Sequence, residues 1–165
     1  MHRAIRQLRN DHQIILGRLD DLERALNEEL CRPGVVEAVR QVASFFDGEF
    51  LAHIAVEEKA LCSEMSEVVG AKDEAIRQML EEHQEIRRLA GEFVAAARAL
   101  DNSLDRFAVV ARWAREMNEL LREHMYKEDY YLFPIAEKGL LREHQFDAMA
   151  RRLAEMEKLP SESSK

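Results

Sequence analysis

The stretch HMYKEDYYLFP, residues 124–134, contains the pattern that organises this chain. An earlier stretch, HIAVEEKALC at residues 53–62, shares it: a histidine, a glutamate four positions later, a second acid, and a leucine three positions after that acid. Residues four apart lie on one face of an α-helix, so each stretch directs an imidazole and a carboxylate the same way, about one turn apart. Such a pair suits the binding of one metal ion or the bridging of two.

Two further histidines place both stretches in a tandem repeat. His12 precedes His53 by the same interval, 41 positions, by which His83 precedes His124. The two halves are offset by 71 positions, because every ligand type of the first half recurs at that distance in the second. The candidate metal ligands are the six residues that keep this register: His12, His53, Glu57, His83, His124 and Glu128.

The composition favours long amphipathic helices and excludes several classes of partner. Of the 165 residues, 47% are hydrophobic and 34% are charged, while glycine and proline are few. The net charge of −8 argues against nucleic acid or an anionic membrane as the main partner. No run of apolar residues is long enough to span a membrane, and the first residues do not resemble a secretory signal, so the expected location is the cytoplasm.

Apolar residues at helical spacing, separated by short turn signals, predict an all-α protein. Helices are expected over residues 2–30, 35–67, 73–100 and 104–138, with a shorter fifth helix over 140–158. Short turns between long helices predict an up-down-up-down antiparallel four-helix bundle with an additional C-terminal helix. We expect one domain over residues 1–158, with the bundle at about 2–138, followed by a disordered tail at 159–165.

Counting along the chain from the predicted turns places the four histidines at one height in such a bundle. His12 precedes the turn at Pro33 by 21 positions and His53 follows it by 20, and the other pair is similarly placed about the turn at Asn102. At ~1.5 Å per residue these heights agree to about one helical turn. The same count separates Cys31 and Cys62 along the bundle, so free thiols are expected rather than an internal disulfide.

Six polar residues facing a bundle core need partners, because each buried polar group without one costs about 1–3 kcal/mol. A hydrogen-bonded network of histidine and glutamate is one solution, and metal ions are the other. Two metals fit the donor set better than one, with His12 and His53 on the first, His83 and His124 on the second, and both glutamates bridging. Four imidazoles and two carboxylates suit iron better than zinc or calcium.

These residues resemble the haemerythrin-like, or HHE cation-binding, family of four-helix bundles. The resemblance covers about residues 5–135 and lies in the six candidate ligands together with Leu132, Phe133 and Pro134. It implies a cofactor of two iron ions in an oxo-bridged centre, with small ligands such as oxygen, nitric oxide or azide as partners. The oxygen carriers of the family have a further histidine where this chain has Arg87, and an aspartate five residues after the last histidine. The departure makes the chain more similar to the nitric-oxide, iron–sulfur-repair and iron-sensing members.

The resemblance leaves the function open among three classes. The first is a non-haem di-iron protein that binds or responds to oxygen, nitric oxide or iron status. The second is an iron–sulfur repair factor or iron donor, or an enzyme that reduces nitric oxide or peroxide. The third is a metal-dependent signalling module that reports to another protein.

Some residues near the ligands have weaker assignments. Tyr131 is a candidate to hydrogen-bond Glu128 or a bound oxo species, with core packing as the alternative. Glu49 either lines an access path or lies on a solvated helix edge, and Arg87 is a surface charge or a charge behind the ligands. The acids that follow each glutamate are expected to face solvent or lysines: Glu58 and Asp129. The fifth helix has an apolar stripe that covers the bundle or a second subunit, in a homodimer: Phe146, Met149, Leu153 and Met156.

Overall fold

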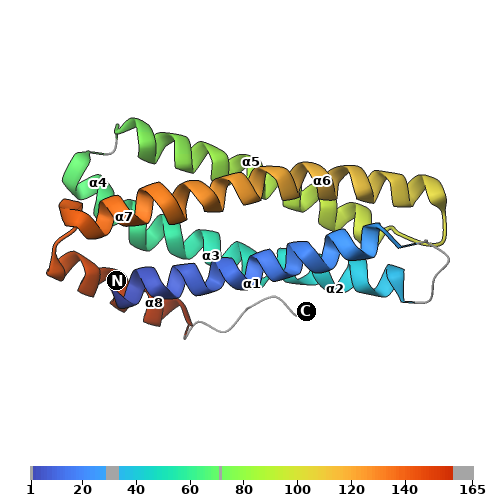
Figure 1. Ribbon diagram of the computed structural model, residues 1–165, viewed down its shortest axis with the longest axis horizontal. Coiled ribbons are helices and arrows are strands. Elements are labelled where there is room, and N and C mark those ends of the chain that lie inside the picture. The colour runs from blue at the N-terminus through green and yellow to red at the C-terminus, as the bar shows by residue number, and fades with distance from the viewer. Residues whose placement is uncertain (1, 29–33, 71, 158–165) are drawn as a thin grey trace.

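The computed structural model describes residues 2–28, 34–70 and 72–157, and within these ranges the chain forms only helices and connecting turns (Figure 1). The prediction of an all-α protein is therefore confirmed. The α-helices are α1 (Arg3–Leu26), α2 (Val35–Asp47), α3 (Glu49–Glu57), α4 (Ser63–Val69), α5 (Glu74–Arg98), α6 (Leu104–Lys127), α7 (Phe133–Ile135) and α8 (Glu143–Glu157). Three π-helical segments lie between them: η1 (Glu58–Cys62), η2 (Glu128–Leu132) and η3 (Ala136–Leu140).

The long helices pack side by side along the long axis of the molecule (Figure 1). Helix α2 contacts α1 and α5, and α6 contacts α5 and α1, so these four helices enclose a common interior. Each presents apolar residues three or four positions apart, which places them on the buried face of an amphipathic helix. Packing of those faces, rather than helix propensity alone, provides most of the stability of such helices.

Two helices that the sequence predicts as continuous are interrupted. The expected helix over 35–67 is divided at Gly48, whose backbone leaves the helical region, and continues through η1 into α4. The expected helix over 104–138 passes through η2 and α7 into η3, where Gly139, with φ of +131°, interrupts the helical backbone. The sequence predicts the break at Gly48 only weakly, because an isolated glycine inside a helical pattern is often tolerated. Both π-helical segments near the histidines begin at the glutamate of the His-x-x-x-Glu pattern or one residue after it, at Glu128 for η2 and at Glu58 for η1.

The turns end the helices close to where the sequence predicts. Helix α1 ends at Leu26 rather than at 30, and residues 29 and 30 lie outside the described part of the chain. Gly34 and Gly70 both have φ near +92°, a backbone conformation that favours glycine, and each adjoins a helix end. Asp73 caps α5 by accepting a hydrogen bond from the backbone N–H of Ala75 at 3.0 Å.

Helix α8 covers one end of the bundle and uses its apolar stripe to do so. Phe146, Met149 and Leu153 are buried in a cluster with residues of α1, η1 and α4. The side chain of Met156 and the expected disordered tail at 159–165 lie outside the described residues. The described part of the stripe is already buried within the chain. A homodimer through α8 therefore stays a prediction, and other residues of this helix would have to form its interface.

The interior consists of two apolar clusters with a polar layer between them. One cluster, which includes Ile15, Phe46 and Phe93, lies towards the end where α1 meets α2. The other, which includes Leu8 and Phe133, lies towards the end covered by α8. The six candidate ligands occupy the layer that separates the two clusters. Free Cys62 belongs to the α8 cluster, and burial raises the pKa of its thiol; Cys31 lies outside the described residues.

Candidate metal centre

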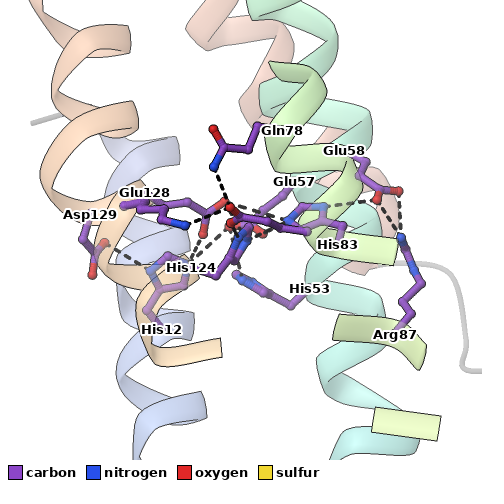
Figure 2. Close-up of polar contacts among 12 residues, drawn as sticks. His12, His53, Glu57, Glu58, Gln78, His83, Arg87, His124, Glu128 and Asp129 are labelled. Atoms are coloured by element: carbon purple, nitrogen blue, oxygen red, sulfur yellow. Dashed lines mark hydrogen bonds and ion pairs between the residues drawn. The ribbon is translucent and has the colours of Figure 1, made fainter. Parts of the chain in front are cut away.

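The structure brings all six predicted ligands together inside the bundle (Figure 2). Helices α1, α3, α5 and α6, with the first residue of η2, supply them, and none of the six is more than 9% exposed. Each glutamate lies at a junction, because Glu57 is the last residue of α3 before η1 and Glu128 is the first residue of η2. Single π-helical turns are rare and frequently occur at functional sites, where they change the direction of a side chain by widening the helix.

The side-chain atoms that face the centre form two groups. Glu57, His83, His124 and Glu128 each place one donor atom within 4.8 Å of the others, and His12, His53 and Glu57 do the same. Glu57 therefore belongs to both groups. Glu128 also approaches both, since its Oε1 lies 3.4 Å from His124 Nε2 and its Oε2 lies 3.3 Å from His12 Nε2. This arrangement fits two ions that share both glutamates.

In each of the four histidines of the centre, the ring nitrogen that points away from the other ligands, Nδ1, faces a carboxylate. The Nδ1 atom of His12 lies 3.1 Å from Asp129, and the Nδ1 atom of His53 lies 3.4 Å from Asp11. Nδ1 lies 3.1 Å from Glu58 in His83 and 2.8 Å from Glu82 in His124, and Figure 2 shows the pairs formed by His12 and His83. Carboxylates behind metal-bound histidines are a recurrent feature, because they fix the ring orientation and make the other nitrogen a better ligand.

The four acids behind the histidines follow the same offset as the ligands themselves. Asp11 and Glu82 are 71 positions apart, and so are Glu58 and Asp129. The expectation that Glu58 and Asp129 face solvent or lysines is therefore wrong, because both contact histidines of the centre. The sequence contains the signal that identifies these acids, since all four recur at the same offset as the histidines.

The donor set fits bound metal. If the Nδ1 atoms carry protons donated to the four carboxylates, all four Nε2 lone pairs point into the centre, where His83 Nε2 and His124 Nε2 are only 3.0 Å apart. The two carboxylate oxygens of Glu128 are buried and have no hydrogen-bond partner. Cations placed between these atoms would satisfy both the converging imidazoles and the Glu128 oxygens. Without metal, protons must take the place of the cations.

The pKa values show where those protons reside in the metal-free protein. Burial lowers the pKa of His12, but the hydrogen bond to Asp129 and the nearby carboxylates of Glu128 and Glu57 outweigh burial and raise that pKa to about 12. The same opposition between burial and neighbouring carboxylates raises the pKa of His53 to about 9 and that of His124 to about 10. Burial lowers the pKa of His83.

The glutamates show the complementary shift. Burial raises the pKa of Glu57, but the charge of His53 and the hydrogen bond from His12 lower it well below its usual value. Burial and the charge of Glu57 raise the pKa of Glu128, yet His124 and His12 hold it below the usual value. Both glutamates are thus ionised, and the centre offers two carboxylates at neutral pH.

The two halves differ in the cations that lie behind their carboxylates. Arg87 donates to both oxygens of Glu58, at 2.7 and 2.8 Å, and Lys127 donates to Glu82 at 2.8 Å. The residues 71 positions earlier in the chain are Leu16 and Val56, which carry no charge. Arg87 thus lies behind His83, and its side chain points to Glu58 rather than to the six candidate ligands (Figure 2).

The structure also tests the assignments of Tyr131 and Glu49. Tyr131 is 59% exposed and hydrogen-bonds Tyr126 rather than Glu128, so neither core packing nor contact with that ligand describes it. Glu49 is exposed, in agreement with a solvated helix edge.

A pocket of about 220 Å³ lies on the surface beside the centre. It lies between α5 and the segment from the end of α6 to α7, and His124 and Glu128 contribute to its wall. The sequence did not predict it, because a pocket depends on how side chains from distant segments pack.

Comparison with known proteins agrees with this site. Residues 3–136 match the family model of the hemerythrin HHE cation binding domain. Comparisons with curated proteins and with solved structures give no match. No helix in the described part of the chain combines the length and the apolar character needed to cross a membrane. Since the matched region covers most of the sequence and contains all six residues of the centre, the chain belongs to the hemerythrin HHE cation binding domain family.

Proposed function

We propose that this chain is a non-haem di-iron protein that binds oxygen or nitric oxide, or responds to iron status. The observation that carries the proposal is the convergence of four buried Nε2 atoms and two buried carboxylates, each imidazole supported by a carboxylate on its far side. Nitrogen and oxygen donors in this proportion suit iron, whereas structural zinc sites are closed by four ligands.

The up-down-up-down order of the bundle is part of the same proposal. It is supported by the contacts of α2 with α1 and α5 and of α6 with α5 and α1. In that order each half of the repeat is a helix pair that contributes two histidines and a glutamate. The two pairs then face each other across the metal layer, as in other bundles that hold metals between facing helices.

Iron in this centre would supply reversible redox chemistry and coordination positions for a small ligand. His12 and His53 would hold one ion, His83 and His124 the other, and both glutamates would bridge. The acids behind the histidines keep each ring in the orientation and tautomer that metal binding requires. The apolar clusters above and below the layer exclude bulk water from the ligands.

The experiment is metal analysis of freshly purified protein expressed with iron, together with optical spectra in air and under nitric oxide. We expect about two irons per chain, near-ultraviolet absorption in air, and a new spectrum with nitric oxide. His53→Ala should lose metal, while His144→Ala is the matched control because His144 is exposed and outside the centre. One zinc per chain without iron would refute the proposal.

Iron donation, as in iron–sulfur repair, is a second candidate. A pocket of about 220 Å³ lies against two of the candidate ligands, His124 and Glu128. Its position beside these ligands favours release of iron to a chelating acceptor. Transfer of iron from loaded protein to an apo iron–sulfur enzyme, in the presence of a sulfide source, separates this role from ligand binding.

A further inference from the structure

An exposed tyrosine stripe lies on the outer face of the segment from the end of α6 to α7. Its members are Tyr126, Tyr130, Tyr131 and Ile135, which are 52%, 66%, 59% and 54% exposed. The rings of Tyr130 and Tyr131 both lie near the ring of Tyr126, with centroids 4.6 and 6.0 Å away. The π-helical segment η2 allows this, because its wider turn brings residues four and five positions apart to one face. Three aromatic rings are thereby concentrated on one surface.

The metal centre does not require the tyrosine stripe. The equivalent positions of the first half, at the same offset as the ligands, carry no aromatic ring: Ala55, Lys59, Ala60 and Glu64. There the chain packs its own helix, since Ala60 is 0% exposed and Glu64 pairs with Arg152 of α8 at 2.9 Å. Helix α8 packs against α1, α3, η1 and α4, and the tyrosine stripe stays exposed. The stripe is therefore the uncovered counterpart of a surface that binds a helix in the first half.

The tyrosine stripe borders a recess. Tyr131 and Ile135 also line the pocket of about 220 Å³ between α5 and the α6–α7 segment, together with the apolar side chains of Met79 and Leu132. Projecting rings beside an apolar recess can be self-complementary, because a two-fold axis places the projection of each copy against the recess of the other.

Opposite charges flank the two ends of the tyrosine stripe. Helix α6, η2 and α7 follow one another in a line (Figure 1). Glu119 lies seven positions before Tyr126, and Lys138 lies seven positions after Tyr131. Both charged residues are exposed, and neither forms an ion pair with another residue that the structure describes. Antiparallel packing of two such segments about a two-fold axis places the Glu119 of each copy opposite the partner's Lys138.

We propose that the tyrosine stripe is the interface of a two-fold homodimer, in which the α6–η2–α7 segments of two copies pack antiparallel. In this arrangement the Tyr126 of each copy packs against the partner's Tyr131, and Glu119 pairs with the partner's Lys138. The stripe contains none of the six candidate ligands, so the inference does not depend on the metal that the centre binds. It also differs from a dimer through α8, whose described apolar residues are already buried within the chain.

The area of the tyrosine stripe indicates how stable this dimer is. At ~200 Å² for a whole aromatic side chain, the four members expose on the order of 400 Å² per copy. A standard interface buries ~800 Å² per partner, so the walls of the pocket and the flanking charges must complete it. We therefore expect a dimer that dissociates on dilution.

The first test is sedimentation velocity of the full chain over a wide range of concentrations, in which wild-type protein should shift from monomer to dimer. Tyr131→Glu places charges inside the interface and should weaken dimerisation at least about tenfold. Because Tyr131 is exposed, the variant should keep its fold, which circular dichroism checks. Leu104→Glu is the control, since Leu104 is 75% exposed and lies at the other end of α6.

Two results of this test would overturn the proposal. Wild-type protein that is monomeric at every concentration would assign the tyrosine stripe to a different protein. A dimer that is unaffected by Tyr131→Glu would place the interface on another surface.

The second test is charge reversal at the two ends of the tyrosine stripe. Glu119→Lys and Lys138→Glu should each weaken dimerisation severalfold, because each places like charges opposite one another. The double variant should regain the wild-type affinity. Contact within one chain cannot produce this recovery, because 19 positions along the helical segment separate the two residues by roughly 28 Å. A double variant no tighter than the single variants would overturn the antiparallel arrangement.

Discussion

The Nδ1 atom of His124 lies 2.8 Å from Oε2 of Glu82, which is 42 positions earlier and on another helix. Glu82 precedes His83 in the sequence, yet it supports the histidine of the neighbouring helix. Asp11 has the same relationship to His53, at 3.4 Å. Each histidine of the centre is therefore oriented by an acid from a different helix, which ties the geometry of the ligands to the packing of the bundle.

Removal of the Glu82 carboxylate should weaken metal binding without unfolding the protein. Glu82→Gln retains size but loses the charge that makes His124 a stronger ligand, and losses of about 10–100-fold in metal affinity are typical for such partners. Competition with a chromophoric chelator measures the affinity. Glu81→Gln is the control, because Glu81 is exposed and its ion pair is with Arg77. Equal affinity in both variants would contradict a role for Glu82 in the centre.

Arg87 should affect the centre through Glu58 rather than as a ligand. Burial raises the pKa of Glu58, but the hydrogen bonds from Arg87 more than compensate and lower it. In Arg87→Leu protein the pKa of Glu58 should rise, so protonation of Glu58 and loss of support for His83 should begin at a higher pH. Titration of metal occupancy with acid checks this, and the comparison is Arg88→Leu, since Arg88 pairs with Glu85 on the surface. Identical acid profiles of the two variants would exclude the role.

Metal binding should release about three protons per chain at pH 7. His12, His53 and His124 have pKa values of about 12, 9 and 10 in the metal-free protein, so all three are protonated at that pH and must lose a proton to bind metal. Calorimetric titration with metal in buffers of different ionisation enthalpy gives the number directly. Release of no protons would mean that the imidazoles are not the ligands.

The metal-free protein should lose stability as the pH rises from about 7 to 10. The raised pKa values of His12, His53 and His124 stabilise the fold fully below their unfolded value of about 6.5, and this contribution is lost as the pH passes through about 9 to 12. The lowered pKa of Glu57 acts in the opposite direction, since its contribution is present above about 4.5 and is lost in acid. Melting temperatures of chelator-treated protein from pH 5 to 10 measure this, and a flat profile would contradict it.

Truncation of Met149 should destabilise the protein by about 2–5 kcal/mol, the usual range for a buried methionine changed to alanine. Met149 is 0% exposed and belongs to the cluster that joins α8 to α1 and η1. Denaturant unfolding of the metal-free protein measures the change. Asp147→Ala, on the exposed side of α8, is the control. A change below ~0.5 kcal/mol in Met149→Ala would mean that α8 is only loosely attached.

The order of residues was enough to establish the helical class and the set of residues that meet in the centre. Helical periodicity of Ile5, Leu8 and Ile15 places His12 on a buried face, and a constant offset between two halves can select residues that share one layer. These signals are local or repetitive, so they can be read from the sequence without knowledge of the packing. The same offset contained four further acids, although their partners could not be assigned from it, because each contacts a histidine on a different helix: Asp11, Glu58, Glu82 and Asp129.

Packing in three dimensions was needed to establish which part of the bundle α8 covers. The repeat gives Ala4 and Ala75 equivalent places, but α8 packs over the first and leaves the second exposed. Packing also sets the local geometry at Gly48 and in the π-helical segments η1 and η2, which depends on how each helix fits its neighbours. Such features arise from contacts between segments far apart in the chain, and the periodicity within one segment cannot predict them.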